Sequence, residues 1–100
     1  KIKPNKLETK FDIFLQTHFP SKFKYVGDGY TFIGGKNPDF IDFQNKKIIE
    51  LFGNYWHEEA EVEERKNHFK KYGYKTLIIW EKEINNLNII KLVDNFIKNE

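Results

Sequence analysis

Residues 36–57 read KNPDFIDFQNKKIIELFGNYWH, and the rest of the chain is organised around this stretch. Apolar residues alternate with polar ones in two runs, at 39–43 and 47–52. Polar residues around Gln44 and Asn45 separate the two runs. Alternation at period two with a short polar break predicts a β-hairpin.

The register of this hairpin places two carboxylates together. If Gln44 and Asn45 form a two-residue turn, Phe43 pairs with Lys46, and counting back sets Asp39 directly opposite Glu50. Directly opposed side chains share one face of a sheet, with Cβ atoms about 5 Å apart, and like charges there repel each other. Burial of a carboxylate is also costly unless it is paired or bound to a cation. The pair therefore predicts a site for a hard divalent cation such as Mg²⁺.

Composition limits the class of protein. One hundred residues, with ten Phe, five Tyr and two Trp, suffice for a single domain spanning 1–100 with one core. The absence of Cys excludes disulfides and a thiolate zinc site, and it fits a cytoplasmic setting. No apolar run approaches the roughly 20 residues of a membrane-spanning helix. Because the chain starts with Lys, we expect it to be a piece excised from a longer protein.

Helical and strand patterns alternate along the remaining sequence. Helices on both faces of a small mixed sheet follow from this alternation. The expected elements are a helix capped by Asn5 and ended by Pro20, strands at 21–26 and 30–33, a helix over 58–73, a central strand at 76–80 covered on both faces, and a last helix capped by Asn85 or Asn86.

The hairpin and the residues after it supply candidate catalytic groups. Asp39, Glu50 and the backbone carbonyl of Leu51 could hold one Mg²⁺, which would activate a bound water. His57 follows the second strand and titrates near neutrality, so it is a candidate proton carrier. As alternatives, Asp39 is a turn residue at the strand entry and His57 packs against its aromatic neighbours.

Three further charged residues have two interpretations each. Glu8 lies at the boundary of the first helix's apolar stripe, where it either orients a metal-bound water or closes a capping box. Lys36 follows two glycines and either contacts a phosphate or belongs to a plain surface loop. Arg65 falls inside an apolar stripe, where it either pairs with a Glu or points at the substrate backbone. Glu50, in turn, could pair with Lys47 or Arg65.

Three motifs carry a family resemblance. They are PDF at 38–40, IIELFGNYWH at 48–57 and GYKTLIIWE at 73–81. They resemble the very short patch repair (Vsr) endonucleases, and most closely the Vsr-like nuclease domains of phage and intron homing endonucleases. This resemblance implies an α/β fold of the restriction-endonuclease-like PD-(D/E)xK superfamily, an α/β/α sandwich around a small mixed sheet.

The resemblance also implies an activity. It implies Mg²⁺-dependent hydrolysis of phosphodiester bonds in double-stranded DNA, with Mn²⁺ able to substitute, Asp39 as the main metal ligand and His57 as the catalytic histidine. Homing-type members follow a Glu-Asp-x-His-Asp pattern, whose first, second and fourth positions match Glu8, Asp39 and His57. The last acid stays open among three neighbours, Glu58, Glu61 and Glu64.

Departures from the family pattern refine this expectation. Phe52 stands where the superfamily lysine falls, and the structural zinc cluster of the repair enzymes cannot form without Cys. We therefore favour a homing-type enzyme in a bacterial or phage-infected cell over a mismatch-repair nicking endonuclease. Arg65 is the only arginine, so sequence-specific DNA reading is expected from a separate, missing recognition domain. A catalytically silent nucleic-acid-binding domain and a hydrolase acting on RNA remain alternatives.

Overall fold

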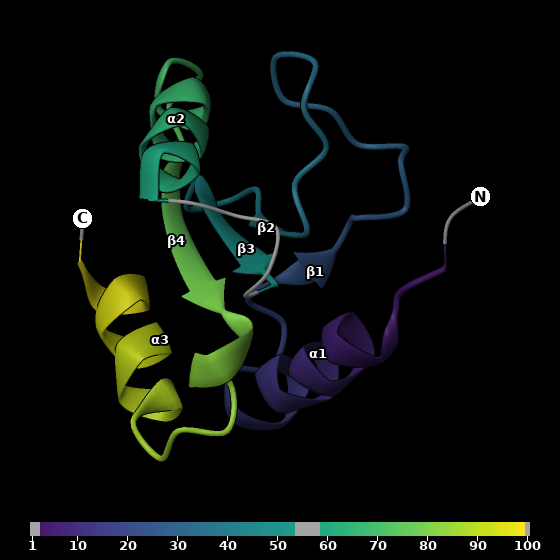
Figure 1. The fold of residues 1–100 in the computed structure, drawn as a ribbon, viewed down its shortest axis with the longest axis vertical. Helices are drawn as coiled ribbons and strands as arrows, with labels where there is room; N and C mark the ends of the chain where they lie inside the picture. Colours follow the sequence, from purple (N-terminus) through teal and green to yellow (C-terminus); the bar gives the residue numbers. More distant parts are fainter. Residues whose placement is uncertain (1–2, 54–58, 100) are drawn as a thin grey trace.

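The fold is a four-stranded mixed sheet with three α-helices, and the computed structural model describes residues 3–53 and 59–99 (Figure 1). The strand order is β1-β2-β3-β4, with the first two pairings antiparallel and β3–β4 parallel. No helix in these two ranges is long and apolar enough to span a membrane. In chain order the elements are α1 (Lys6–His18), β1 (Lys24–Tyr25), β2 (Phe40–Asp42), β3 (Lys47–Phe52), α2 (Glu59–Lys70), β4 (Lys75–Trp80), a 3-10 turn η1 (Glu81–Glu83) and α3 (Ile89–Lys98).

The register of the β2–β3 hairpin confirms the prediction from the sequence. Ile41 pairs with Ile48 and Phe40 with Ile49, so the next position along the ladder sets Asp39 opposite Glu50. The alternation of side chains along a strand places these two carboxylates on the same face of the sheet as Ile41 and Ile48.

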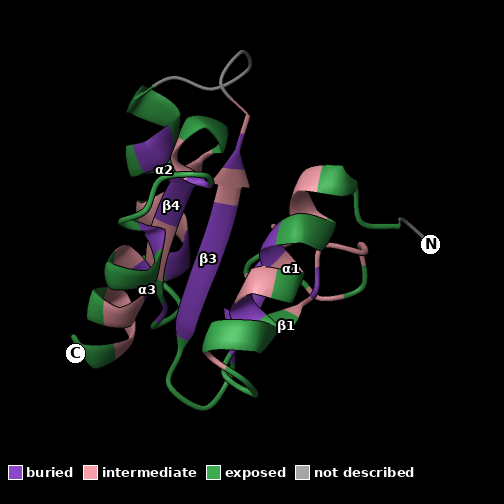
Figure 2. Cartoon of the chain, turned by 90° about the horizontal axis from the view of Figure 1, so that it is seen from below, coloured by how far each residue is buried: buried purple, intermediate pink, exposed green. Residues whose placement is uncertain are grey.

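Helices cover both faces of the sheet. On one face, α1 and α3 bury a core that includes Phe11, Phe40, Ile49 and Val93. On the other face, Phe69 of α2 packs with the neighbouring strand residues. In Figure 2, β3 is buried along most of its length, as expected of a strand enclosed between two helical layers. The predicted α/β/α sandwich is confirmed.

The ends of two helices are fixed by specific side chains. The Asn5 side chain accepts a hydrogen bond from the Glu8 backbone, and the Glu8 carboxylate accepts one from the Asn5 backbone, so the predicted capping box is present. At the other end of the chain, the buried Lys47 ammonium closes the C-terminal end of α3. Its Nζ donates to three backbone carbonyls, those of Phe96 at 2.8 Å, Ile97 at 2.7 Å and Asn99 at 2.5 Å.

The structure corrects the position of one strand and the start of one helix. Residues 76–80 lie in β4, which is an edge strand of this sheet rather than a central one, whereas β2 and β3 each have a strand on both sides. The apolar run in β4 reflects helices on both faces, a property that does not determine how many strands flank it. Helix α3 begins after Asn88, whose side chain makes no capping bond, and not after Asn85 or Asn86.

The segment before β2 is a loop and not the predicted strand at 30–33, and β1 is shorter than the predicted 21–26. In the loop, Ile33 forms only an isolated bridge with Lys36. The Asn37 side chain donates to the carbonyls of Val26 at 2.7 Å and Thr31 at 2.6 Å. It thereby supplies to the loop the hydrogen bonds that a strand partner would otherwise provide.

Candidate active site

Asp39 and Glu50 lie where β2 begins and β3 approaches its end, and each binds the other strand's backbone. The Asp39 N–H donates to Glu50 Oε2 at 2.7 Å. The Leu51 N–H donates to Asp39 Oδ2 at 2.8 Å. These crossed hydrogen bonds orient both carboxylates, which the sheet register alone would leave free to rotate.

The electrostatics of the pair reflect its burial. Desolvation, followed by the charge of Glu50, raises the pKa of Asp39 to about 8, although the Leu51 N–H opposes the rise. Desolvation also raises the pKa of Glu50, against the opposing effect of the Arg65 guanidinium. Burial is thus the main reason that both carboxyl groups resist ionisation, and at Asp39 the neighbouring charge of Glu50 adds to it.

Arg65 of α2 provides the cationic contact to this pair. Its Nε donates to Glu50 Oε1, and its Nη2 donates to the Asn37 carbonyl at 3.0 Å. The guanidinium carbon also lies 5.2 Å from the centre of the Phe69 ring. Of the two partners that the sequence left open for Glu50, the structure selects Arg65, because Lys47 extends from the other face of the sheet to α3.

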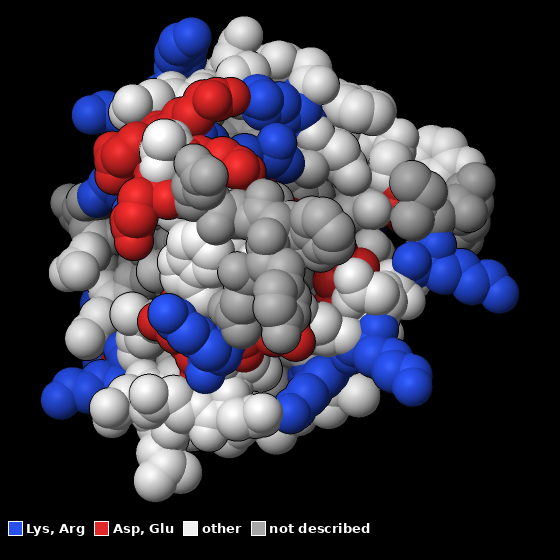
Figure 3. All heavy atoms as spheres, viewed as in Figure 1, with Lys and Arg blue, Asp and Glu red and all other residues white. Residues whose placement is uncertain are grey.

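A pocket of about 330 Å³ opens over the carboxylate pair. Lys36 lines it and lies 3.9 Å from the Glu64 carboxylate, so its charge is partly matched. Figure 3 shows acidic side chains gathered over α2, which contributes two glutamates to the pocket. The lining residues are Lys36, Asp39, Glu50, Leu51, Phe52, Glu61, Glu64 and Arg65.

Glu8 is not brought into this pocket. Besides capping α1, its carboxylate accepts a hydrogen bond from the Tyr25 hydroxyl at 3.2 Å. It lines an adjacent pocket of about 500 Å³, and Leu51 lines both pockets. The capping interpretation is thus confirmed, and a role toward a metal-bound water stays a prediction. His57 and Glu58 lie outside the described residues.

The donor set of the site suits a hard divalent cation. The described part of the chain contains no group of three His, Cys, Asp or Glu residues placed to hold a metal ion. Two carboxylates, Asp39 and Glu50, are nevertheless side by side, and Mg²⁺ usually takes one or two carboxylates and keeps several waters. The oxygen donors present therefore fit Mg²⁺, with the Leu51 carbonyl as a further candidate ligand.

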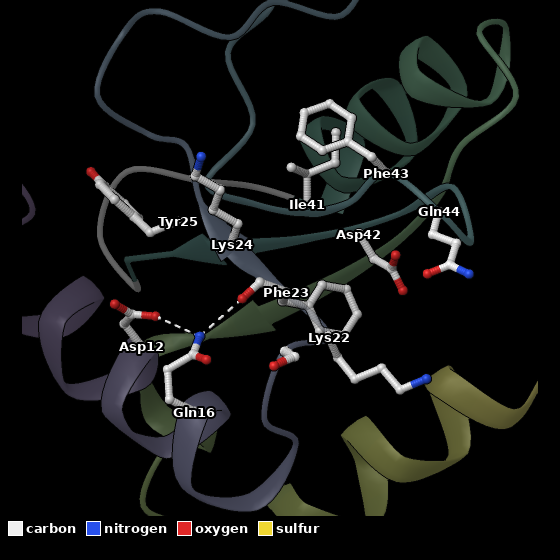
Figure 4. Close-up of a pocket in the computed structure, with 11 residues that line it drawn as sticks. Asp12, Gln16, Lys22, Phe23, Lys24, Tyr25, Ile41, Asp42, Phe43 and Gln44 are labelled. Carbon is white, nitrogen blue, oxygen red and sulfur yellow. Dashed lines mark hydrogen bonds between the residues drawn. The ribbon is translucent and has the colours of Figure 1, made fainter.

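A larger pocket, of about 520 Å³, lies between α1, β1 and β2 (Figure 4). Its two carboxylates are engaged by neighbouring amides: Asp12 accepts from Gln16, and Asp42 accepts from the backbone and side chain of Asn45. Gln16 also donates to the Phe23 carbonyl at 2.9 Å. This pocket has no directly opposed pair of carboxylates like Asp39 and Glu50, so it is a weaker candidate for a metal or catalytic site than the smaller pocket.

Sequence reasoning did not identify Asn37 as part of the site. Its side chain holds the preceding loop and its carbonyl accepts from Arg65, so it positions the guanidinium beside Glu50. The available signal was the Asn-Pro step, which is typical of a turn rather than of a strand.

Comparisons with known proteins bear on the fold. No protein-family model matches the sequence, and no curated protein matches it significantly. Among solved structures, the chain is similar to the "Homing Endonuclease I-Bth0305I Catalytic Domain", with a TM-score of 0.69 and 20% sequence identity over 93% of this chain and 94% of that one. The chain therefore has the fold of a homing endonuclease catalytic domain, as its resemblance to homing-type nuclease domains led us to expect.

Proposed function

We propose that this chain is the catalytic domain of a Mg²⁺-dependent DNA endonuclease of the homing type, which hydrolyses phosphodiester bonds. The observation that carries the proposal is the crossed pair of carboxylates, half-buried Asp39 and buried Glu50, at the end of the hairpin. The fold shared with a homing endonuclease catalytic domain supports it.

The proposal gives each candidate residue a role. Asp39, Glu50 and the Leu51 carbonyl would hold Mg²⁺, for which Mn²⁺ would substitute. When bound, the ion would lower the pKa of a water and offset charge on the phosphate. His57 would transfer a proton at the attacking water or the leaving oxygen, and Glu8 would orient a water from the α1 side.

Double-stranded DNA is the proposed substrate, bound with help from a separate recognition domain. Exposed glutamates on α2 disfavour close contact between that helix and a phosphate backbone. Lys36 would contribute a phosphate contact at the pocket, but a single arginine in the whole chain offers little for reading base edges. We expect the enzyme to act in the cytoplasm of a bacterial or phage-infected cell.

Plasmid cleavage tests the proposal. The purified chain is incubated with supercoiled plasmid in Mg²⁺, in Mn²⁺ and in EDTA, beside the Asp39→Asn variant. The matched control is Asp42→Asn, which changes a carboxylate on the same strand that lies outside the site. Cleavage that requires both the metal and Asp39, and that survives in the control, is the expected result.

Weak DNA affinity is a separate cause of inactivity, so the same experiment is repeated with the chain fused to a foreign DNA-binding domain. Cleavage near the site of that domain is expected. A fusion that binds its site but leaves the plasmid intact in Mg²⁺ and Mn²⁺ would refute the nuclease and favour a silent nucleic-acid-binding domain.

A further inference from the structure

Both oxygens of the Glu50 carboxylate are engaged by protein donors. Oε2 accepts from the Asp39 backbone, and Oε1 accepts from Arg65 Nε. A divalent cation that uses Glu50 as a ligand therefore meets the Arg65 guanidinium at the same carboxylate. Metal and arginine compete for one partner.

The charges of the site favour a divalent ion over the guanidinium. Asp39 and Glu50 together carry two negative charges when ionised, whereas Arg65 supplies one positive charge. One divalent cation would balance both carboxylates, which a single arginine cannot do.

The surroundings of Arg65 allow it to leave Glu50. The Arg65 side chain is 26% exposed, against 2% for Glu50, and it lines the open pocket over the pair. Its contacts with the Asn37 carbonyl and the Phe69 ring do not involve the carboxylate. A modest rotation of the Arg65 side chain would break the contact with Glu50 and keep part of the contacts with Asn37 and Phe69.

We propose that Arg65 is an exchangeable counter-ion of the metal site: it neutralises Glu50 in the metal-free protein and yields that carboxylate to the divalent cation. The inference rests on the proposed function, because it takes Glu50 as a metal ligand. It adds a residue whose contacts differ between the metal-free and the metal-bound states.

Nuclear magnetic resonance can follow the exchange directly. Arg65 is the only arginine, so the chain has a single arginine Nε–H signal, which needs no further assignment. In EDTA this proton is expected to be shifted and protected from water exchange by its bond to Glu50. Saturating Mg²⁺ should move the signal toward that of a free arginine, whereas NaCl at equal ionic strength should not.

Calorimetry with variants measures the same coupling as an affinity. Binding of Mn²⁺ to Arg65→Gln should be at least about fivefold tighter than to the wild type, the lower end of typical coupling between two linked events. The matched control is Lys36→Gln. Lys36 lines the same pocket and carries the same charge as Arg65, but its ion pair is with Glu64 and not with Glu50. Circular dichroism checks that each variant is folded, and the resonance experiment on the wild type tests the exchange if Arg65→Gln is not folded.

Each outcome decides the inference. Weaker Mn²⁺ binding by Arg65→Gln would mean that Arg65 holds Glu50 in place for the metal, and an equal gain in Lys36→Gln would mean general electrostatics. Either result would refute the exchange and leave the proposed function standing. The same holds if the wild type binds Mg²⁺ and cuts DNA but its Nε–H signal does not move when Mg²⁺ is added. If the wild type does not bind the ion, and its fusion to the foreign DNA-binding domain does not cut DNA, both the proposed function and the exchange are refuted.

Discussion

Asp39→Asn should stabilise the metal-free protein while abolishing cleavage. The pKa of Asp39 is raised from 3.8 to about 8, mainly by burial and then by the charge of Glu50. At pH 7 a shift of this size corresponds to at most about 4 kcal/mol of lost stability. Asp39 is partly exposed, so solvent screens part of this cost. The neutral amide keeps an oxygen for the Leu51 N–H, and we expect a gain of about 1–2 kcal/mol.

The assay is thermal unfolding in EDTA at pH 7, followed by circular dichroism. For a domain of this size the expected gain raises Tm by roughly 5–10 °C. The gain should shrink toward zero below about pH 3, where the carboxyl of the wild type binds a proton in both the folded and the unfolded state. Asp42→Asn, the control on the same strand, should not be stabilised. An unchanged or lower Tm for Asp39→Asn at pH 7 would show that the carboxylate pair carries no electrostatic strain.

Three other predictions concern the pH dependence, the proton carrier and the fold. In EDTA, the free energy of unfolding of the wild type should fall as pH rises from about 4 to 8, because the folded state keeps the Asp39 proton that the unfolded chain has released. Urea titrations in which the free energy of unfolding rises over this pH range would contradict the prediction. His57→Ala should slow cleavage by about 10²–10⁴ and flatten the pH–rate profile, and an unchanged profile would remove His57 from proton transfer. Lys47→Met should lower the free energy of unfolding by about 2–4 kcal/mol, since three carbonyls at the C-terminal end of α3 and its C-cap lose a charged donor, while calorimetry should find Mn²⁺ affinity unchanged.

The core of the site could be predicted from the sequence because local rules determine it. Side-chain alternation and turn length set the register of the hairpin, and the register sets Asp39 against Glu50. The capping box at Asn5 and Glu8 is likewise a relation between residues three apart in the chain. In both cases the partners are close in sequence, so few alternatives compete.

Long-range relations could not be predicted in the same way. Strand alternation already places Lys47, three residues before Glu50, on the opposite face of the sheet. That Arg65 is the partner of Glu50 depends on which helix covers that face, and periodicity does not contain this information. The edge position of β4 has the same origin, because an apolar run reports burial by helices and not the number of neighbouring strands. The role of Asn37 in the loop depends on contacts that only the folded chain creates.

The turn at the tip of the hairpin has a consequence for how this domain can evolve. Residues 43–46 lie at the far end of the ladder from Asp39 and Glu50, and Lys46 adopts a left-handed backbone with φ of 56°. One inserted residue that shifted the ladder by a single position would set Asp39 against a side chain from the opposite face of the sheet. The length of the turn therefore determines which residues face each other at the other end of the hairpin, where the candidate site lies. A substitution at the tip that keeps this length would leave Asp39 opposite Glu50, whereas an insertion or deletion that shifts the ladder would separate them.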